Sequence, residues 1–245
     1  MINNKTVFIT GSSSGIGFHL ARLFKESNYE VIINGRNLKK LKKASVKLGN
    51  CNFIEGDLTK EKSVLKIIKT IRKKFKSLDV LICNQGNSEF KNNNLNFKFA
   101  FDNNFFSSIN LINNSRQILK KNNSKIICIS SICGHEAVDG APIGYSVAKS
   151  ALNFYIKNFS YELAKNGISI NGIVPGNIYF EGSTWHKKII KNPKKTKKYI
   201  EKNVPMNKFG NIQDIFEVCI MISESSSNYL TGSLIKIDGG QTKSI

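Results

Sequence analysis

Residues Thr6-Val7-Phe8-Ile9-Thr10-Gly11-Ser12-Ser13-Ser14-Gly15-Ile16-Gly17 decide the fold of this chain. Residues 5–10 are typical of a buried strand, and apolar side chains at helical spacing follow the glycines over residues 18–24. Glycines let a backbone approach a pyrophosphate, and the N-terminus of a helix offers free N–H groups and positive charge. We therefore predict a phosphate site over residues 11–17; a glycine-rich turn without function is the alternative.

The rest of the chain alternates between strand and helix patterns. Six further segments are typical of strands, at residues 30–34, 52–55, 79–83, 125–129, 169–174 and 234–237. Helical patterns occupy residues 38–48, 62–75, 97–119 and 145–165. This alternation predicts an α/β fold: a doubly wound parallel seven-stranded sheet with helices on both faces, forming a single domain over residues 1–245. Such sheets bind ligands beyond the carboxyl ends of their strands.

The end of the second strand indicates which nucleotide the phosphate site takes. In a dinucleotide-binding fold an acidic residue here binds the ribose 2′-hydroxyl, whereas an arginine accommodates a 2′-phosphate. Gly35 and Arg36 stand at this place, which favours NADP(H) over NAD(H), unless Arg36 only caps the turn. Asp57 ends the third strand, where its carboxylate suits either the adenine amino group or the start of the next helix.

Tyr145-Ser146-Val147-Ala148-Lys149 carries the predicted chemistry. Residues four apart lie on the same face of a helix, so the phenol of Tyr145 and the ammonium of Lys149 point into one pocket. A neighbouring cation lowers the pKa of a phenol, and such a pair passes a proton to or from a carbonyl or alcohol oxygen. Taken alone, the same spacing also occurs by chance on solvated helix faces.

Composition narrows the class of protein. No run of eighteen apolar residues exists, and the apolar residues 7–9 are too few for a signal peptide, so we expect a soluble, cytoplasmic protein without a membrane partner. The five cysteines form no Cys-x-x-Cys pair, which predicts free thiols and no metal site. The net charge of +20 invites a nucleic-acid partner, but the 37 basic residues include four arginines and mostly dispersed lysines. We predict no nucleic-acid partner.

At this point the chain resembles the short-chain dehydrogenase/reductase family in its shorter, single-domain form, with a Rossmann-like fold. The resemblance covers residues 3–241 and rests on ordered motifs. These are Thr10-Gly11-xxx-Gly15-Ile16-Gly17, Asp57-Leu58, Cys83-Asn84-Gln85-Gly86, Asn104, Ser130-Ser131 with Gly134, Tyr145-xxx-Lys149, Pro175-Gly176, Tyr229-Leu230-Thr231-Gly232 and Asp238-Gly239-Gly240.

The resemblance implies a role for each matching residue. Tyr145 is the general acid and base, Ser131 holds the substrate oxygen, Lys149 lowers the pKa of Tyr145 and binds the nicotinamide ribose, and Asn104 holds a water of a proton relay. The implied cofactor-binding residues are Gly11, Ser13, Ser14, Gly15, Ile16, Gly17, Arg36, Asp57, Leu58, Asn84, Gly86, Tyr145, Lys149, Pro175, Gly176 and Ile178.

Three positions depart from the family pattern. Gln85 replaces a small alanine beside the cofactor ribose, and Cys83 replaces the first asparagine of that motif. Phe180 stands where the family often has a threonine that contacts the cofactor. We expect the lost hydroxyl to weaken cofactor binding without abolishing the chemistry.

The substrate is the least determined part of the prediction. In the family, residues 181–203 form a mobile lid over the substrate. Here they carry eight lysines, which indicates either a solvated helix or attraction of an anionic substrate. The residues expected to line the substrate pocket are His135, Glu136, Trp185, Asn87, Ser88 and Glu89.

These features together predict an NADP(H)-dependent oxidoreductase that interconverts a secondary alcohol and a ketone, similar to a 3-oxoacyl-carrier-protein reductase. One alternative is a sugar or nucleotide-sugar dehydrogenase or reductase of surface-glycan biosynthesis, and another is a nucleotide-binding protein without catalysis. The family usually forms homodimers or homotetramers through the helices at residues 97–119 and 145–165, so we expect the same here.

Overall fold

The computed structural model describes residues 4–87 and 96–244 and contains one seven-stranded sheet. The strands are β1 (Thr6–Ile9), β2 (Glu30–Gly35), β3 (Asn52–Glu55), β4 (Val80–Cys83), β5 (Lys125–Ile129), β6 (Ser169–Pro175) and β7 (Leu234–Ile237). All neighbours pair in parallel in the order β3-β2-β1-β4-β5-β6-β7. The order reverses between β1 and β4, which makes their carboxyl ends the expected ligand crevice.

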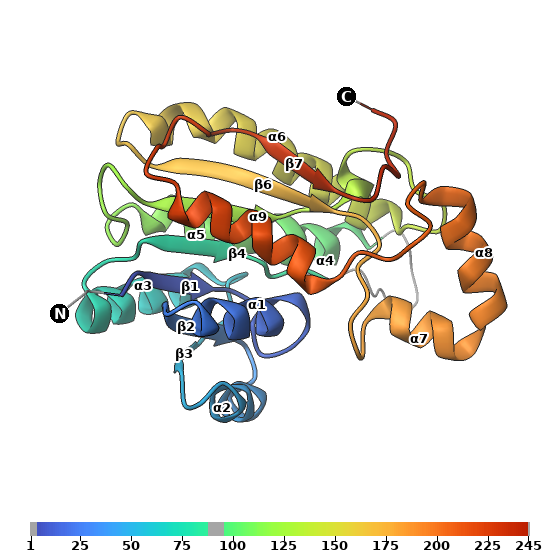
Figure 1. The fold of residues 1–245 in the computed structure, drawn as a ribbon. Helices are drawn as coiled ribbons and strands as arrows, with labels where there is room; N and C mark the ends of the chain where they lie inside the picture. The colour runs from blue at the N-terminus through green and yellow to red at the C-terminus, as the bar shows by residue number, and fades with distance from the viewer. Residues whose placement is uncertain (1–3, 88–95, 245) are drawn as a thin grey trace.

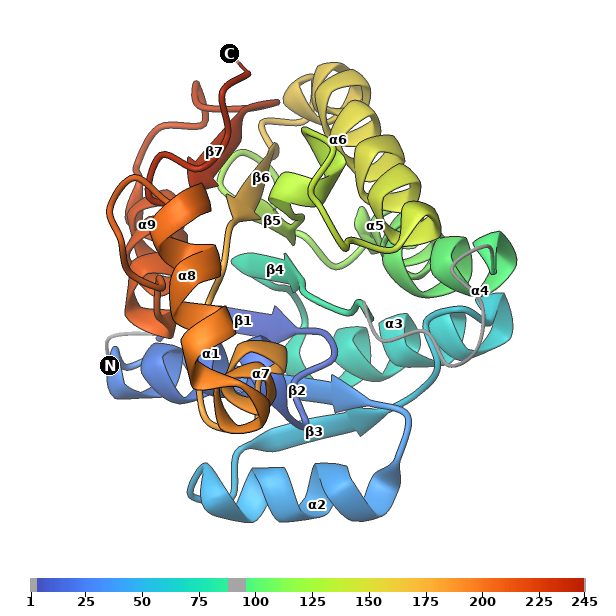
Figure 2. The same ribbon diagram turned by 90° about the vertical axis from the view of Figure 1, so that its right-hand side faces the viewer.

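Helices cover both faces of this sheet (Figures 1 and 2). The helices of the described residues are α1 (Gly15–Glu26), α2 (Leu38–Lys47), α3 (Glu61–Phe75), α4 (Phe97–Phe101), α5 (Ser107–Ser115), α6 (Ile143–Ala164), α7 (Thr184–Lys191), α8 (Pro193–Asn203) and α9 (Ile212–Glu224). Short 3₁₀ and π segments occupy Ile132–Gly134 and Asp102–Phe106.

Alternate residues of the central strands build two cores, one on each face of the sheet. Val7 and Ile9 of β1 pack with α1, α2 and α9, whereas Phe8 packs with α3, α5 and α6. All three side chains are fully buried, as expected for a parallel strand covered on both sides. The predicted α/β sheet and its seven strands are therefore confirmed, with strand ends correct to within one residue.

The predicted helix over residues 97–119 is wrong in detail. Helical structure ends at Ser115, and five residues with π-helical geometry, Asp102–Phe106, separate α4 from α5. A π segment adds a residue to the turn and is frequent at functional sites. Here it turns Asn103 and Asn104 inward, and both are buried.

Two helices stand apart from the layers of the sheet. In Figures 1 and 2, α7 and α8 lie beyond the carboxyl ends of the strands, where residues 181–203 were predicted to cover the substrate. Within the described residues, no helix combines the length and the apolar character that crossing a membrane requires.

Candidate active site

A cavity of about 890 Å³ opens at the carboxyl ends of the strands. The turn after β1, the ends of β4, β5 and β6, the first turns of α6, and the α7–α8 segment all line it. The cavity thus lies where the order of the strands reverses, as expected for a doubly wound sheet.

Most of the predicted site residues meet in this cavity. They are Asn104, Ser131, Tyr145, Lys149, Gly11, Ser13, Ser14, Gly15, Ile16, Arg36, Asn84, Gly86, Pro175, Gly176, Ile178 and Trp185. The predicted residues that do not line it are Gly17, Asp57, Leu58, His135 and Glu136. Asn87 lines the cavity, whereas Ser88 and Glu89 lie outside the described residues.

The glycines of the first turn are required by close contacts with the turn after β4. Gly11 has a φ of 60°, and a Cβ there would lie 2.9 Å from the Cα of Gln85. A Cβ on Gly17 would collide with the side-chain amide of Asn84. That amide donates to the Thr10 carbonyl at 2.9 Å, so Asn84 joins the two turns. Gly17 therefore shapes the site from behind the cavity wall.

The opposite side of the same turn suits a phosphate group. Gly15 has a φ of 65° at the start of α1, and no atom lies within 4 Å of where its Cβ would stand. The Ser14 side chain does not cap this helix, and no acidic residue occupies its first turn. The N–H groups of the first turn are therefore available to an anion.

Two polar side chains in the cavity fit a phosphorylated dinucleotide. The Arg36 guanidinium lines it after β2 and has no acidic partner among the described residues. The Gln85 side-chain nitrogen is buried and finds no hydrogen-bond acceptor within residues 4–87 and 96–244. Buried donors are rarely left unpaired, so Gln85 has a donor to offer to a bound group.

The loop after β5 presents Ser131 to the cavity. Its hydroxyl accepts from the Cys133 N–H at 3.2 Å and starts the 3₁₀ segment. The Gly134 that follows has no room for a side chain, because a Cβ would lie 2.6 Å from the backbone carbon of Lys149. Asn153 donates to the Gly134 carbonyl at 3.1 Å and accepts from Ser130 at 2.5 Å. The loop is thus clamped onto α6, which fixes Ser131 beside Tyr145 and Lys149.

Burial controls the protonation of the Tyr145 and Lys149 pair. It raises the pKa of Tyr145 to about 12, and a hydrogen bond with Ser131 opposes this rise. Burial lowers the pKa of Lys149 to about 8, and the thiols of three cysteines oppose that fall. Desolvation of the phenol thus outweighs the hydrogen bond that lowers the pKa of Tyr145. The predicted role of Lys149 in lowering this pKa stays a prediction.

Both the oxygen and the nitrogen of the Asn104 side-chain amide form hydrogen bonds. Its oxygen accepts from the Asn87 N–H at 2.9 Å, and its nitrogen donates to the carbonyls of Asn87 and Ala100. A Cβ on Gly86 would lie 2.9 Å from the Asn104 oxygen and 3.4 Å from the Lys149 ammonium. Asn104 therefore lies beside Lys149 and holds the turn after β4 in place.

The predicted residues outside the cavity are used elsewhere. Asp57 accepts from the N–H and hydroxyl of Thr59 in the turn before α3, whose N-cap is Lys60, and Leu58 is buried in the core. Glu136 accepts from the backbone N–H groups of Lys243 and Ser244, so it fixes the end of the chain. His135 ends the 3₁₀ segment.

The α7–α8 segment brings aromatic side chains to the substrate end. The Trp185 ring lies 5.1 Å from the Tyr199 ring and 4.2 Å from the Lys188 ammonium. Phe180, in place of the usual threonine, lines the cavity and contacts the His19 ring at 5.4 Å. Sequence reasoning missed Tyr199 and Cys133; the aromatic character of Tyr199 within a lysine-rich segment was the available signal.

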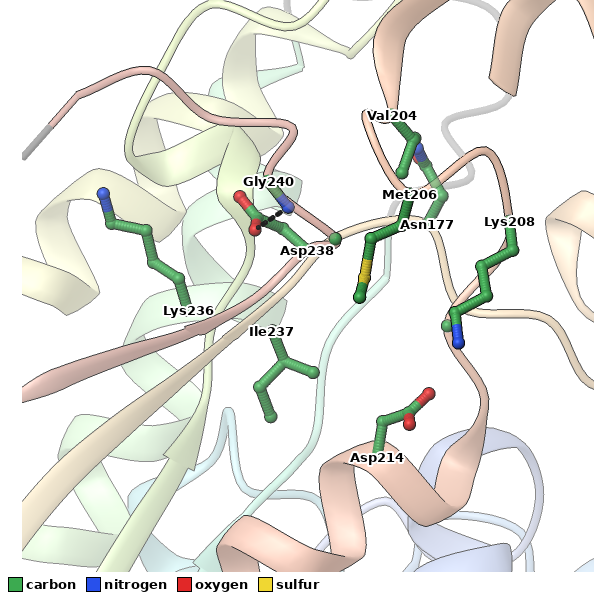
Figure 3. A pocket seen from close by; sticks show the side chains of 11 residues that line it. Asn177, Val204, Met206, Lys208, Asp214, Lys236, Ile237, Asp238 and Gly240 are labelled. Atoms are coloured by element: carbon green, nitrogen blue, oxygen red, sulfur yellow. Dashed lines mark hydrogen bonds between the residues drawn. The ribbon is translucent and has the colours of Figure 1, made fainter. Parts of the chain in front are cut away.

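A second cavity of about 350 Å³ adjoins the first across Asn177 (Figure 3). Its carboxylates serve local structure: Asp238 accepts from the Gly240 N–H at 3.0 Å, and Asp214 caps the start of α9. None of the predicted catalytic residues lines it. We therefore assign the chemistry to the larger cavity. All five cysteines are free thiols, as predicted.

A glycine-rich turn and a Tyr–Lys pair that open into one cavity on a parallel sheet define the class: an oxidoreductase with a dinucleotide-binding fold. Residues 11–242 match the family model described as enoyl-(acyl carrier protein) reductase. The chain belongs to the short-chain dehydrogenase/reductase family.

Known relatives agree with this assignment. The chain is 30% identical to the 3-oxoacyl-(acyl-carrier-protein) reductase FabG of Rickettsia prowazekii, over 98% of this chain and 97% of the relative. The L-sorbose reductase of Gluconobacter frateurii, solved with NADPH and L-sorbose, shares the fold with a TM-score of 0.86 at 23% identity, over 100% and 98% of the two chains. The RhlG/NADP complex of Pseudomonas aeruginosa gives 0.86 at 24% identity, over 98% and 96%.

Proposed function

We propose that this protein is an NADP(H)-dependent oxidoreductase that interconverts a ketone and a secondary alcohol, and that it resembles a 3-oxoacyl-carrier-protein reductase. One observation carries the proposal: the glycine-rich turn, Arg36 and the group Ser131, Tyr145 and Lys149 line one continuous cavity. The FabG relative is named for reduction of a 3-oxoacyl group, which makes 3-oxoacyl thioesters the first substrates to test.

Residues along the cavity would hold NADP(H) from end to end. The first turn of α1 would bind the pyrophosphate, and Arg36 the 2′-phosphate, which favours NADP(H) over NAD(H). Lys149 would bind the nicotinamide ribose, with Asn84, Gly86 and Ile178 lining the path. The cofactor supplies a hydride to the substrate carbon when bound. Two structural relatives are described as complexes with NADPH or NADP, which supports this choice.

Tyr145 would supply the proton. A phenol with a pKa of about 12 is protonated at neutral pH, so it acts as an acid toward the oxygen of a ketone. Ser131 would hold the same oxygen and orient it toward Tyr145. Lys149 is charged in most molecules at neutral pH, because its pKa is about 8, and its charge would stabilise the phenolate left after proton transfer. Asn104 would keep the relay to solvent in place.

Sugars are the second substrate candidate. A structural relative is described as an L-sorbose reductase with its sugar bound, and polar groups of Asn87, Asn103 and Asp139 line the cavity. A sugar or nucleotide-sugar enzyme of surface-glycan biosynthesis would turn over a sugar panel and leave acyl thioesters unchanged. A nucleotide-binding protein without catalysis would bind NADPH and reduce no carbonyl compound in either panel.

The proposal also covers the lid, the assembly of subunits and the cellular compartment. Residues 181–203 would act as a lid within a single domain, and a homodimer or homotetramer would form through α6, which exposes Phe154 by 74% and Tyr161 by 71%. Five free cysteines fit the reducing conditions of the cytoplasm.

The direct test is a fluorescence titration of NADPH and NADH against the wild type, Arg36→Ala and the control Arg72→Ala, whose side chain is exposed on α3. We expect NADPH to bind more tightly than NADH, and Arg36→Ala alone to remove the preference by weakening NADPH about tenfold or more, the scale of a lost charge-assisted hydrogen bond. Equal affinities in the wild type would refute the assignment of Arg36. Binding of neither nucleotide would refute the proposed enzyme.

A further inference from the structure

One lysine of the α7–α8 segment lines the cavity. Residues 181–203 contain eight lysines and two glutamates. All eight lysines belong to the described residues, and Lys188 is the one that lines the cavity. The others lie on the outer faces of the two helices, where Lys197 approaches Glu201 at 3.8 Å. A substitution of Lys188 therefore tests specific contact with a bound group, and a substitution of another lysine tests general attraction of anions.

Aromatic contacts hold Lys188 at this position. Its ammonium lies 4.2 Å from the centroid of the Trp185 ring, within the range of a cation–π interaction. Trp185 is itself fixed between Tyr199 at 5.1 Å and Phe209 at 5.3 Å. The Lys188 ammonium thus lies against a wall of packed aromatic rings.

Lys188 faces the same space as the reacting groups. Burial raises the pKa of the Cys133 thiol, and the positive charge of Lys188 is among the weaker effects that oppose this rise. The Cys133 N–H donates to the Ser131 hydroxyl at 3.2 Å, so the thiol stands next to the serine that would hold the substrate oxygen. Lys188 and the serine that would hold the substrate oxygen therefore line the same cavity.

The other cations that line the cavity, Lys149 and Arg36, leave this role to Lys188. Lys149 is buried and donates to the Ile129 carbonyl at 2.8 Å, and Arg36 directly follows β2, where it would bind the 2′-phosphate. No ion pair within residues 4–87 and 96–244 engages Lys188. A cavity-lining cation with no carboxylate partner among the described residues suits a substrate anion.

Resting on the proposed function, we propose that Lys188 binds a carboxylate or phosphate ester carried by the ketone substrate, while Trp185 and Tyr199 contact the carbon atoms between that anion and the carbonyl. Lys188 is then a specificity-determining residue: it favours ketones with an anionic group over neutral ketones of the same size.

Trp185 is the one tryptophan of the chain, so its fluorescence reports on this wall directly. The wild type, Lys188→Gln, Lys188→Arg and the control Lys191→Gln, an exposed lysine on the same helix, are titrated with and without NADP⁺. The probes are two matched pairs: acetoacetate with its ethyl ester, and dihydroxyacetone phosphate with dihydroxyacetone. The pairs distinguish a carboxylate from a phosphate as the preferred anion.

We expect the Trp185 fluorescence to show that at least one anion binds more tightly than its neutral partner. Lys188→Gln should weaken binding of that anion about tenfold, as for a lost charge-assisted hydrogen bond, and Lys188→Arg should restore the affinity. Lys191→Gln should behave as wild type. Equal binding of neutral and charged partners, no response to either anion, or equal losses in Lys188→Gln and Lys191→Gln would each overturn the inference.

Turnover separates this inference from the proposed function. With NADPH as reductant, Lys188→Gln should raise KM for the preferred anionic ketone about tenfold and leave KM for its neutral partner unchanged. Failure to bind NADPH would remove the proposed function while the fluorescence titration without nucleotide still decides whether Lys188 binds an anion. Binding and turnover that are indifferent to Lys188→Gln would leave the enzyme intact and remove the inference.

Discussion

The Lys149 ammonium donates to the Ile129 carbonyl at 2.8 Å and lies 5.9 Å from the centroid of the Tyr145 ring. This cation is 3% exposed, so water contributes little to its solvation. The carbonyl and the aromatic ring are weaker partners than a carboxylate, which explains why the pKa of Lys149 falls to about 8. The arrangement keeps a cation beside the proton donor at a cost to the stability of the fold.

That cost predicts a pH dependence of stability. Between pH 8 and 10.5 the unfolded chain binds a proton that the folded chain has lost at Lys149, so the free energy of unfolding rises with pH in this window. Relative to Lys149→Met, the wild type should gain about 2 kcal/mol between pH 7.5 and 10, from roughly 1.4 kcal/mol per pKa unit. Denaturant unfolding of both proteins measures the difference.

The control for this experiment is Lys157→Met, an exposed lysine on the same helix. Its stability relative to wild type should stay constant with pH. A constant difference between wild type and Lys149→Met over the same range would mean that Lys149 is not desolvated.

Tyr145→Phe tests the proton donor. The substitution keeps the ring and removes the hydroxyl, so kcat for ketone reduction should fall by about 10²–10⁴ while the affinity for NADPH is retained. In the wild type, alcohol oxidation should accelerate from pH 7 to 10, because the required phenolate has a pKa of about 12. Tyr161→Phe, 71% exposed on the same helix, is the matched control. Retained activity in Tyr145→Phe would exclude Tyr145 as the acid.

The sequence predicted the sheet and most of the cavity because both follow from short-range patterns. Continuous apolar runs specify buried strands, and the glycine-rich turn follows one of them directly. The π segment at Asp102–Phe106 escaped prediction, since one extra residue in a turn leaves the apolar periodicity nearly unchanged. The direction of the Tyr145 pKa escaped because burial depends on the loop after β5 and on α6 together. The contact of Glu136 with Lys243 and Ser244 also escaped prediction, because it joins distant parts of the chain.

Gln85 stands where the family has a small alanine, and Gln85→Ala tests whether the larger side chain contributes to cofactor binding. Gln85 lines the cavity, and its buried side-chain nitrogen has no acceptor in the described part of the chain, so a bound dinucleotide should accept a hydrogen bond from it. We expect Gln85→Ala to weaken NADPH and NADH by a similar factor of about five, the scale of one neutral hydrogen bond. Isothermal titration calorimetry measures both, with the exposed Gln213→Ala as control. Unchanged affinity for both nucleotides would show that Gln85 only fills space.

Phe154→Glu tests the proposed assembly. Phe154 is 74% exposed and Tyr161 is 71% exposed on α6, and two large aromatic side chains two turns apart form an apolar stripe that a second copy would cover. A buried, unpaired carboxylate in such an interface is costly, so Phe154→Glu should shift sedimentation toward the monomer. Val46→Glu, at a 66% exposed position on α2, changes charge equally and should leave the assembly intact.

Since Tyr145 and Lys149 lie on the same helix as Phe154, loss of the dimer should also lower kcat. A wild type that sediments as a monomer would contradict the proposed assembly.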